Sequence, residues 1–491
     1  MARRLLSCVA LAAVLAFAVP PLARAATPDP TAYVERGVQQ VRDDAAAACR
    51  TPLRSAPDPS APEACTPLDG RTISEAQMKA YESGWAHRAL SLQRGLDANA
   101  PLAEEQLPHT HNSFNASSYT LGSTSYYPTL TNQDPNQVYS ITDQLRMDVR
   151  AIEIDVHWWP SPFGNASTGG KWVTMCHGDS SQTNGAVHIG CTWDRPFQDG
   201  LAEVKAWLVA HPDQFILLYL ENQLDDQNGP NPQAHEIAAQ LIAQGLGSLV
   251  YQPPAGQPCA PMPTGTSRAD LAMGGHQVLI VGNCGPGAWG SWVHEREPHW
   301  DEHGDPSTYG DTDCTADLNE RAADPGLFRR EFEDSTWLAA NLGDGTNHLS
   351  TPATVARMLQ CGVNIIGLDQ LTPQDPRLAA LVWSWAVNEP KGGAGDCAYQ
   401  GSDGRFHAGD CKDKRNFACV DSSGGWHVTA ATAKWDKSGK LCGSEFPGSH
   451  FGVPPNGLRN QLIVEAKGSP SDEVWLNYAN VNGAWTPSLG S

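Results

Sequence analysis

The sequence has few basic residues and, after its first 25 positions, no long apolar run. Thirty-three lysines and arginines stand against 54 aspartates and glutamates, so the net charge is −21. Such an acidic surface repels phosphate backbones, and no basic stretch interleaved with aromatic residues occurs, so we expect no nucleic-acid partner. No later run approaches the roughly 20 apolar residues of a membrane-spanning helix. We therefore expect a soluble protein that reaches any lipid through apolar contacts or bound cations.

The N-terminus has the features of a secretory signal peptide. Two arginines precede the apolar run 5–19, and Ala23 and Ala25 supply the small residues of a cleavage site. The run is too short to cross a membrane. We expect residues 1–25 to be removed and the mature protein to be secreted.

No CxxC pair occurs, which disfavours a zinc site. Thirteen cysteines are present, and loss of Cys8 with the leader leaves an even number in an exported chain, so we expect disulfides. Spacing alone does not fix their connectivity. Neighbours in the sequence suggest the pairs Cys49–Cys65, Cys176–Cys191 and Cys259–Cys284.

Composition divides the mature chain into three parts. Residues 26–99 start with an Ala-, Pro- and Asp-rich segment, expected to be extended, and end in a helix predicted at 74–94. Residues 100–386 alternate strands with helices. Residues 387–491 are rich in Cys, Trp and Gly, which predicts a small disulfide-rich C-terminal module. Its last part contains two predicted strands, 461–465 and 474–478.

The middle part predicts an α/β fold. Two of its apolar runs are apolar almost throughout, as in strands that are buried on both faces. Helices are predicted at 199–210 and 234–244. The alternation favours a (β/α)8 TIM-type barrel, in which chemistry occurs at the C-terminal ends of the strands. The predicted strands are 104–109, 151–157, 172–176, 215–221, 277–282 and 364–369.

The strand at 151–157 carries two acidic residues on one face. Its isoleucines and valine alternate with Glu153 and Asp155, so both carboxylates point the same way. Such a pair is costly unless a metal or another partner compensates it. Carboxylate oxygens suit a hard cation.

Other polar residues occur where predicted strands end. His111 and Asn112 follow the first strand, His177 follows the third, and Glu221 ends the fourth. In a barrel these positions share one end, so we expect the side chains to meet.

Four stretches resemble the catalytic X region of the metal-dependent, phosphatidylinositol-specific phospholipases C. The resemblance is close over residues 104–225 and looser over the rest of the barrel. The four stretches occur in the order of the family: Thr110-His111-Asn112-Ser113, Arg150 through Asp155 with its Glu-Ile-Asp core, Cys176-His177-Gly178 and Leu220-Glu221-Asn222.

The resemblance implies a ligand set and two catalytic histidines. Asn112, Glu153, Asp155 and Glu221 would hold Ca²⁺, and His111 and His177 would do the acid–base and charge-stabilising work. Cleavage of a phosphodiester by a neighbouring hydroxyl needs a base, a stabiliser of negative charge and an acid for the leaving oxygen. We assign the acid to His177. Either His111 or Glu153 could be the base.

Several nearby residues are expected to be structural or ambiguous. His109 and His157 fit buried, hydrogen-bonded histidines, and Arg150 fits a structural ion pair. Trp158, Trp159 and Trp172 fit a rim for a lipid chain and core or loop packing equally well.

The expected protein is a secreted, monomeric, Ca²⁺-dependent phospholipase C-like phosphodiesterase with transient membrane-surface contact. It would cleave phosphatidylinositol-type lipids, or another phosphodiester, to diacylglycerol and an inositol phosphate through a cyclic intermediate. Members that prefer phosphoinositides carry lysines on later strands, and the strand at 277–282 has none. Lipids with extra ring phosphates are therefore not expected substrates.

Two alternatives remain. A glycerophosphodiester phosphodiesterase also uses a Glu-x-Asp pair, but its opening motif is His-Arg-Gly, unlike His111-Asn112-Ser113. A catalytically silent glycan- or lipid-binding protein would have no physical reason to keep both histidines and all four candidate ligands.

Overall fold

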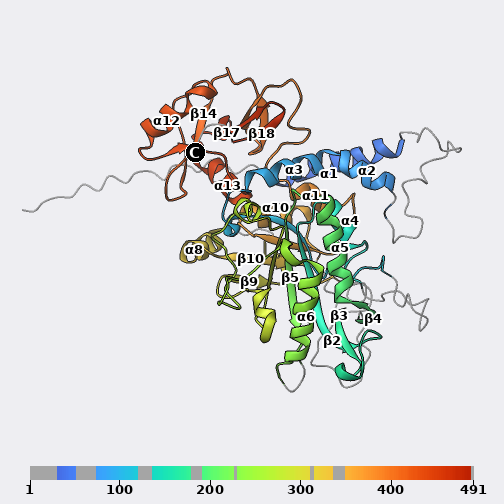
Figure 1. Ribbon diagram of the computed structural model, residues 1–491. Coiled ribbons are helices and arrows are strands. Elements are labelled where there is room, and N and C mark those ends of the chain that lie inside the picture. Colours follow the sequence, from blue (N-terminus) through green and yellow to red (C-terminus); the bar gives the residue numbers. More distant parts are fainter. Residues whose placement is uncertain are drawn as a thin grey trace, which may run out of the picture.

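A mostly parallel, curled sheet forms the centre of the protein in the computed structural model (Figure 1). The structure describes residues 30–50, 73, 75–119, 135–177, 191–225, 229–309, 314–335 and 349–487. In spatial order the central strands are β6 (Val250–Tyr251), β7 (Val278–Gly282), β5 (Ile216–Gln223), β2 (Ala151–Pro160), β1 (Leu107–Thr110), β11 (Ile365–Leu368), β10 (Phe328–Phe332) and β9 (Trp300–His303), with β8 (His294–Glu295) also on β7.

Inward side chains from seven of these strands pack into one apolar cluster, which shows that the sheet curls into a TIM-type barrel. Tyr219 on β5 stacks on Trp300 of β9, with ring centroids 5.0 Å apart. Among the described residues, no ladder of hydrogen bonds joins β9 to β6 or β8, so this side is closed by packing. The predicted fold class is confirmed.

The predicted strand at 172–176 forms, but it is not a barrel strand. β3 (Lys171–Cys176) pairs antiparallel with β2, and β4 (Cys191–Pro196) pairs antiparallel with β3. The connection from β2 to β3 is too short for the crossover that a parallel strand requires. These strands therefore form a branch at the end of β2.

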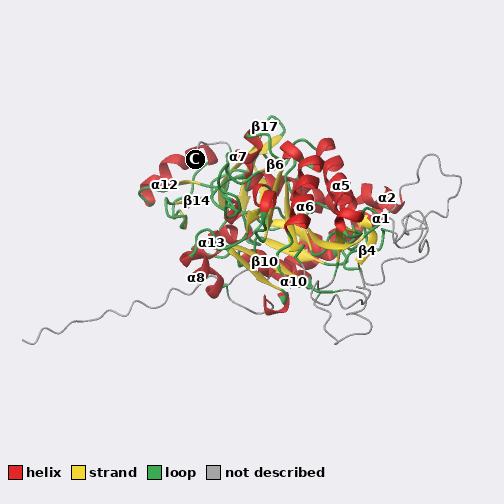
Figure 2. Cartoon of the chain, turned by 60° about the horizontal axis from the view of Figure 1, so that its bottom comes forward, coloured by secondary structure: helices red, strands yellow, loops and turns green. Residues whose placement is uncertain are grey.

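Helices surround the sheet (Figure 2). The predicted helices at 199–210 and 234–244 are confirmed as α5 (Phe197–Ala210) and α6 (Pro232–Gly245). Asn231 caps α6 by accepting the backbone N–H of Ala234, and Pro232 occupies its first turn. The helices of the barrel are α4 (Ile141–Arg146), α5 (Phe197–Ala210), α6 (Pro232–Gly245), α7 (Arg268–Met273), α8 (Thr315–Ala323), α10 (Pro352–Gln360) and α11 (Pro376–Ala380).

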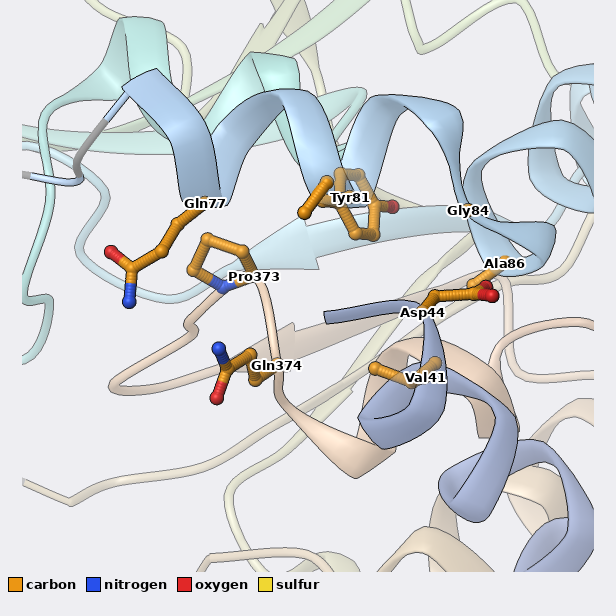
Figure 3. A pocket seen from close by; sticks show the side chains of 9 residues that line it. Val41, Asp44, Gln77, Tyr81, Gly84, Ala86, Pro373 and Gln374 are labelled. Carbon is orange, nitrogen blue, oxygen red and sulfur yellow. The ribbon is translucent and has the colours of Figure 1, made fainter. Parts of the chain in front are cut away.

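The N-terminal part is more helical than predicted. Residues expected to be extended form α1 (Pro30–Arg50), and the helix predicted at 74–94 is split into α2 (Glu75–Ser83) and α3 (Trp85–Leu96). Asp44 of α1 explains the break, because its carboxylate accepts the backbone N–H of Trp85 at 2.8 Å. A small pocket beside this contact is lined by α1, α2 and the segment 373–374 (Figure 3).

A second, seven-stranded sheet forms the C-terminal part. Its elements are β12 (Cys397–Gln400), β13 (Phe406–Gly409), β14 (Asn416–Val420), β15 (Trp426–Val428), β16 (His450–Phe451), β17 (Val474–Val481), β18 (Ala484–Thr486), α12 (Ser438–Glu445) and α13 (Gly457–Ala466). The strand predicted at 474–478 is confirmed. The strand predicted at 461–465 is wrong, because Asn456 caps the start of α13 there. Boundaries at 99 and 386 stay predictions.

Disulfides occur in both sheets. The predicted pair Cys259–Cys284 is confirmed. Cys176 is disulfide-bonded, and Cys191 is its partner in the β3–β4 register, in agreement with the predicted pair. The predicted pair Cys49–Cys65 lies outside the residues whose side chains are described. Sequence spacing had not identified three further bonds: Cys314–Cys361, Cys397–Cys411 and Cys419–Cys442.

None of the helices in the described part of the chain combines the length and the apolar character needed to cross a membrane.

A histidine of the second sheet should make stability depend on pH. His407 lies 3.0 Å from Asp403 and 3.9 Å from Glu389. Burial opposes its protonation, but the two carboxylates outweigh burial and raise its pKa to about 9, compared with about 6.5 in an unfolded chain. The resulting stabilisation is complete below pH ~6.5 and is lost as the pH rises through about 9. We expect the free energy of unfolding to fall by up to about 3 kcal/mol over this range.

Denaturant titrations at several pH values would measure this fall, and His407→Gln should remove most of it. An equal alkaline fall in the variant would contradict the assignment to His407.

Candidate active site and metal centre

Three carboxylates meet inside the barrel, above its apolar layer. Glu153 and Asp155 lie on β2, and Glu221 lies on β5 with its Cα opposite that of Asp155. Adjacent parallel strands in this register direct their side chains to the same face. One ligand oxygen from each residue lies within 4.8 Å of the others. The structure therefore brings together the three acids that the sequence singled out.

Burial of these like charges raises their pKa values. For Asp155 the rise is large, caused first by burial and then by the charges of Glu221 and Glu153. Burial also raises the pKa of Glu153 and of Glu221. Three such groups in a small volume favour either bound protons or a bound cation.

The residues present fit a hard cation. Glu153 and Asp155 are almost fully buried, and the Oε1 atom of Glu153 has no hydrogen-bond partner among the residues that the structure describes. A buried carboxylate oxygen without a donor is costly unless something compensates it. The possible metal site consists of Glu153, Asp155 and Glu221.

Asn112 lies next to these carboxylates. It follows β1 with a φ of 45°, a left-handed conformation that asparagine tolerates better than most residues. Its backbone N–H donates to Oε2 of Glu153 at 3.1 Å. One end of its amide lies 3.0 to 3.1 Å from the two oxygens of Asp155. The nitrogen at that end would donate to Asp155, whereas the oxygen would be a fourth ligand for a shared cation.

His111 lies beside the carboxylates and is backed by an aspartate. Its Nδ1 is 3.3 Å from Asp369, which follows β11 and is fully buried. Its Nε2 is 3.1 Å from the amide of Asn112. Burial lowers the pKa of His111, and its ring packs on Phe332, with centroids 4.8 Å apart. A neutral imidazole oriented by a carboxylate is suited to accept a proton.

His177 follows β3 and is half-buried. In the antiparallel β2–β3 ladder, Met175 pairs with Val156, so the chain beyond it runs back along β2 past Asp155. β5 pairs with one edge of β2. β3 therefore pairs with the opposite edge, which is also the edge that β1 pairs with. The printed register ends at Met175, two residues before His177, so the place of His177 in the site stays a prediction.

Sequence reasoning missed a buried arginine of this site. Arg330 on β10 is ion-paired with Glu153 and Glu302. It also donates to Nε2 of His109 at 3.3 Å, while Nδ1 of His109 donates to the carbonyl of Ala151. Arg330 therefore holds one oxygen of Glu153 and leaves the other for a cation. The sequence contained one signal for Arg330: it alternates with Phe328 and Phe332, so the three side chains share one face of the strand.

Asp369 was present in a stretch that the sequence singled out, but no role was predicted for it. Its carboxylate accepts the backbone N–H of Ser335 at 2.7 Å and the side-chain amide of Gln137 at 3.2 Å. The pKa of Asp369 is raised strongly, first by burial and then by the charge of Glu333. That Asp369 lies near His111 could be found only from the fold, because the two residues are far apart in the sequence.

The neighbouring residues expected to be structural have structural contacts. Arg150 donates to the carbonyls of Leu145 and Val149 and to the side chain of Gln214, and among the described residues it makes no ion pair of the kind expected. Trp158 and Trp172 pack against the main core, and the indole N–H of Trp172 donates to Gln198.

Comparison with known proteins identifies relatives over most of the chain. A family described as "Rv2075c PI-PLC-like domain" matches residues 32–375. "Uncharacterized protein Rv2075c" of Mycobacterium tuberculosis strain ATCC 25618 / H37Rv is 35% identical over 422 residues, which covers 83% of this chain and 82% of the relative. "Uncharacterized protein MT2135" of strain CDC 1551 / Oshkosh matches with the same values.

Solved structures of low identity also match. The phosphatidylinositol-specific phospholipase C from Listeria monocytogenes is 14% identical, with a TM-score of 0.39, and the match covers 60% of this chain and 98% of that chain. A structure of the Staphylococcus aureus phosphatidylinositol-specific phospholipase C is 15% identical, with the same coverage and a TM-score of 0.36.

Proposed function

Because the chain belongs to the Rv2075c PI-PLC-like family, we propose that it is an exported phosphodiesterase that cleaves phosphatidylinositol-type lipids in a Ca²⁺-dependent reaction. The observation that carries this proposal is the meeting of three carboxylates, two of them buried and one half-buried, with the His111–Asp369 pair. Export is supported by the leader-like N-terminus and by the disulfides.

Glu153, Asp155, Glu221 and the amide oxygen of Asn112 would hold the calcium ion. When bound there, the ion would supply positive charge for phosphate oxygens and would make a nearby hydroxyl more acidic. Arg330 keeps one oxygen of Glu153 engaged and so fixes the orientation of that ligand.

His111 is the better candidate for the base. Oε2 of Glu153 already accepts from Arg330 and from the N–H of Asn112, and its other oxygen would hold the calcium ion, so no oxygen of Glu153 would remain for the proton. Nε2 of His111 would take the proton from the inositol hydroxyl next to the phosphate. Asp369 would stabilise the imidazolium that results.

His177 would give a proton to the glycerol oxygen as the phosphorus–oxygen bond breaks. Diacylglycerol leaves with that oxygen, and the inositol hydroxyl stays bound to phosphorus as a cyclic phosphate. Water then opens the ring with the two histidines in reversed roles.

Product analysis tests this function directly. We expect phosphatidylinositol vesicles with Ca²⁺ to yield diacylglycerol and first a cyclic, then an open inositol phosphate. An excess of chelator should lower the rate by at least about a hundredfold, because phosphate charge would lose its main stabiliser. Chromatography of the water-soluble products would identify them. Release of glycerol phosphate from glycerophosphodiesters, without cyclic product, would contradict the proposal.

A further inference from the structure

Arg330 is a positive charge buried inside the barrel. Its side chain is 2% exposed and starts from β10, which β1 and β11 separate from β2. The guanidinium lies 4.8 Å from the ring centre of Tyr219 and 4.2 Å from that of Phe332. Water and salt screen a charge in such surroundings poorly, so it acts strongly on its neighbours.

His109 on β1 holds Arg330 in place on its way across the barrel to Glu153. Nδ1 of His109 donates to the carbonyl of Ala151, so Nε2 accepts from Nε of Arg330 at 3.3 Å. Burial and then the charge of Arg330 keep the pKa of His109 well below its usual value, so the imidazole is neutral. The same guanidinium pairs with Oε2 of Glu153. A fixed positive charge therefore lies directly against one of the candidate metal ligands.

Glu302 on β9 is a second acidic partner of Arg330. Its Oε2 lies 2.8 Å from Nη1 of Arg330 and 3.6 Å from Arg296. Burial opposes its ionisation, but the charge of Arg330 and the indole N–H of Trp300 outweigh burial and lower its pKa. Glu302 is therefore ionised. Arg296 offsets its charge, which leaves the charge of Arg330 to act on the three carboxylates of the candidate metal centre.

The candidate metal centre would have unbalanced charge without this arginine. Its three carboxylates and one divalent cation would together carry one negative charge, and the phosphodiester group of a lipid carries another. Like charges repel strongly where the dielectric constant is low. Arg330 offsets the first of these two charges and so lets the phosphate approach. Because the same positive charge repels a cation, it should also weaken cation binding.

We propose that Arg330 sets the charge of this centre, so that it accepts a phosphodiester with one negative charge and binds its cation less tightly than the acids alone would. This inference rests on the proposed function, because it assigns the substrate preference of the same site. A purely structural arginine would behave differently. Its loss would loosen the centre and weaken the binding of cation and phosphate alike, whereas loss of a charge-setting arginine strengthens cation binding and weakens phosphate binding.

Isothermal titration calorimetry with Ca²⁺ tests the cation part of this proposal without requiring catalysis. We expect Arg330→Met to bind Ca²⁺ at least about tenfold more tightly than the wild type, while its KM for phosphatidylinositol rises about tenfold. Arg330→Lys keeps the positive charge, so both values should stay within about twofold of the wild type.

Glu302→Gln tests the same charge in the opposite direction. It removes a negative charge beside Arg330, so Ca²⁺ affinity and KM should each fall about threefold. The side chain of Glu302 is 27% exposed, so this variant keeps the test open where Arg330→Met does not fold.

Arg329→Met is the matched control, because it removes the same charge from the preceding residue of β10. Arg329 faces the other side of the strand, where it pairs with Asp301 and Asp317. Its Ca²⁺ affinity and KM should stay within about twofold of the wild-type values.

The order of the Ca²⁺ affinities decides the proposal. Unchanged or weaker binding in Arg330→Met, unchanged or tighter binding in Glu302→Gln, or an equal shift in Arg329→Met would overturn it. A wild type that binds no Ca²⁺ would also overturn it. The expected order of affinities without cleavage of any phosphatidylinositol would instead overturn the proposed function and leave the effect of Arg330 on cation binding standing.

Discussion

Replacement of Asp155 by asparagine should lower kcat/KM on phosphatidylinositol by about a thousandfold, which corresponds to roughly 4 kcal/mol of lost transition-state stabilisation. Asp155 is the most perturbed of the three carboxylates, since burial and then the charges of Glu221 and Glu153 raise its pKa. Asparagine has the same shape but gives one neutral oxygen, so affinity for Ca²⁺ should fall strongly.

The same substitution should leave the calcium-free protein as stable as the wild type or more stable. It removes one of three like charges that lie close together and repel one another when no cation is bound. Calcium should raise the Tm of the wild type and should fail to raise that of Asp155→Asn. Thermal unfolding with and without Ca²⁺ would measure both effects.

Asp213→Asn provides a control for this experiment. Asp213 lies in the exposed turn between α5 and β5, at the end of the barrel away from the acids. It should keep both activity and the calcium-induced shift. A wild-type Tm that does not respond to Ca²⁺, or an unchanged response in Asp155→Asn, would contradict a calcium site at these carboxylates.

The sequence predicts the acids of this site because a single strand carries two of them. Alternation along 151–157 places Glu153 and Asp155 on one face whatever the neighbouring strand is. Glu221 joins them only if the strand that carries it lies next to this one, and β5 does pair with β2. Local periodicity and barrel geometry were therefore enough for this part of the site.

Arg330 and Asp369 could not be assigned in the same way. Their partners, Glu153 and His111, are distant in the sequence, and each contact exists only because β1, β10 and β11 are neighbours in the sheet. Gly367 on β11 shows how closely they approach, because a Cβ there would lie 2.8 Å from Phe332. No periodicity within one strand contains this information.

The errors outside the site have similar causes. The helix α13 occupies 461–465, an apolar run too short for its period to separate helix from strand. The N-terminal segment forms α1 because it packs on the rest of the chain, with Tyr33 donating to the carbonyl of Trp385. Tertiary contacts therefore determined the secondary structure of both segments.

Replacement of His177 by alanine should lower the rate of lipid cleavage by roughly a thousandfold, within the range for loss of a general acid. The test of its role is the leaving group. Glycerol oxygen needs a proton as it leaves, whereas nitrophenolate leaves without one. We therefore expect His177→Ala to retain most of its activity on inositol nitrophenyl phosphate. His111→Ala should lose activity on both substrates, because both need the inositol hydroxyl deprotonated.

His276→Ala is the control variant. His276 lies at the other end of the barrel, where its ring contacts the carbonyl of Ser248. It should retain activity on both substrates. Steady-state rates would be measured for both site variants on both substrates. Activity kept by His177→Ala on the nitrophenyl substrate, together with loss of activity on both substrates in His111→Ala, assigns His177 as the acid and His111 as the base. An equal loss on both substrates in His177→Ala would instead assign it to charge stabilisation. The opposite pattern, with His111→Ala rescued by nitrophenolate, would exchange the two roles.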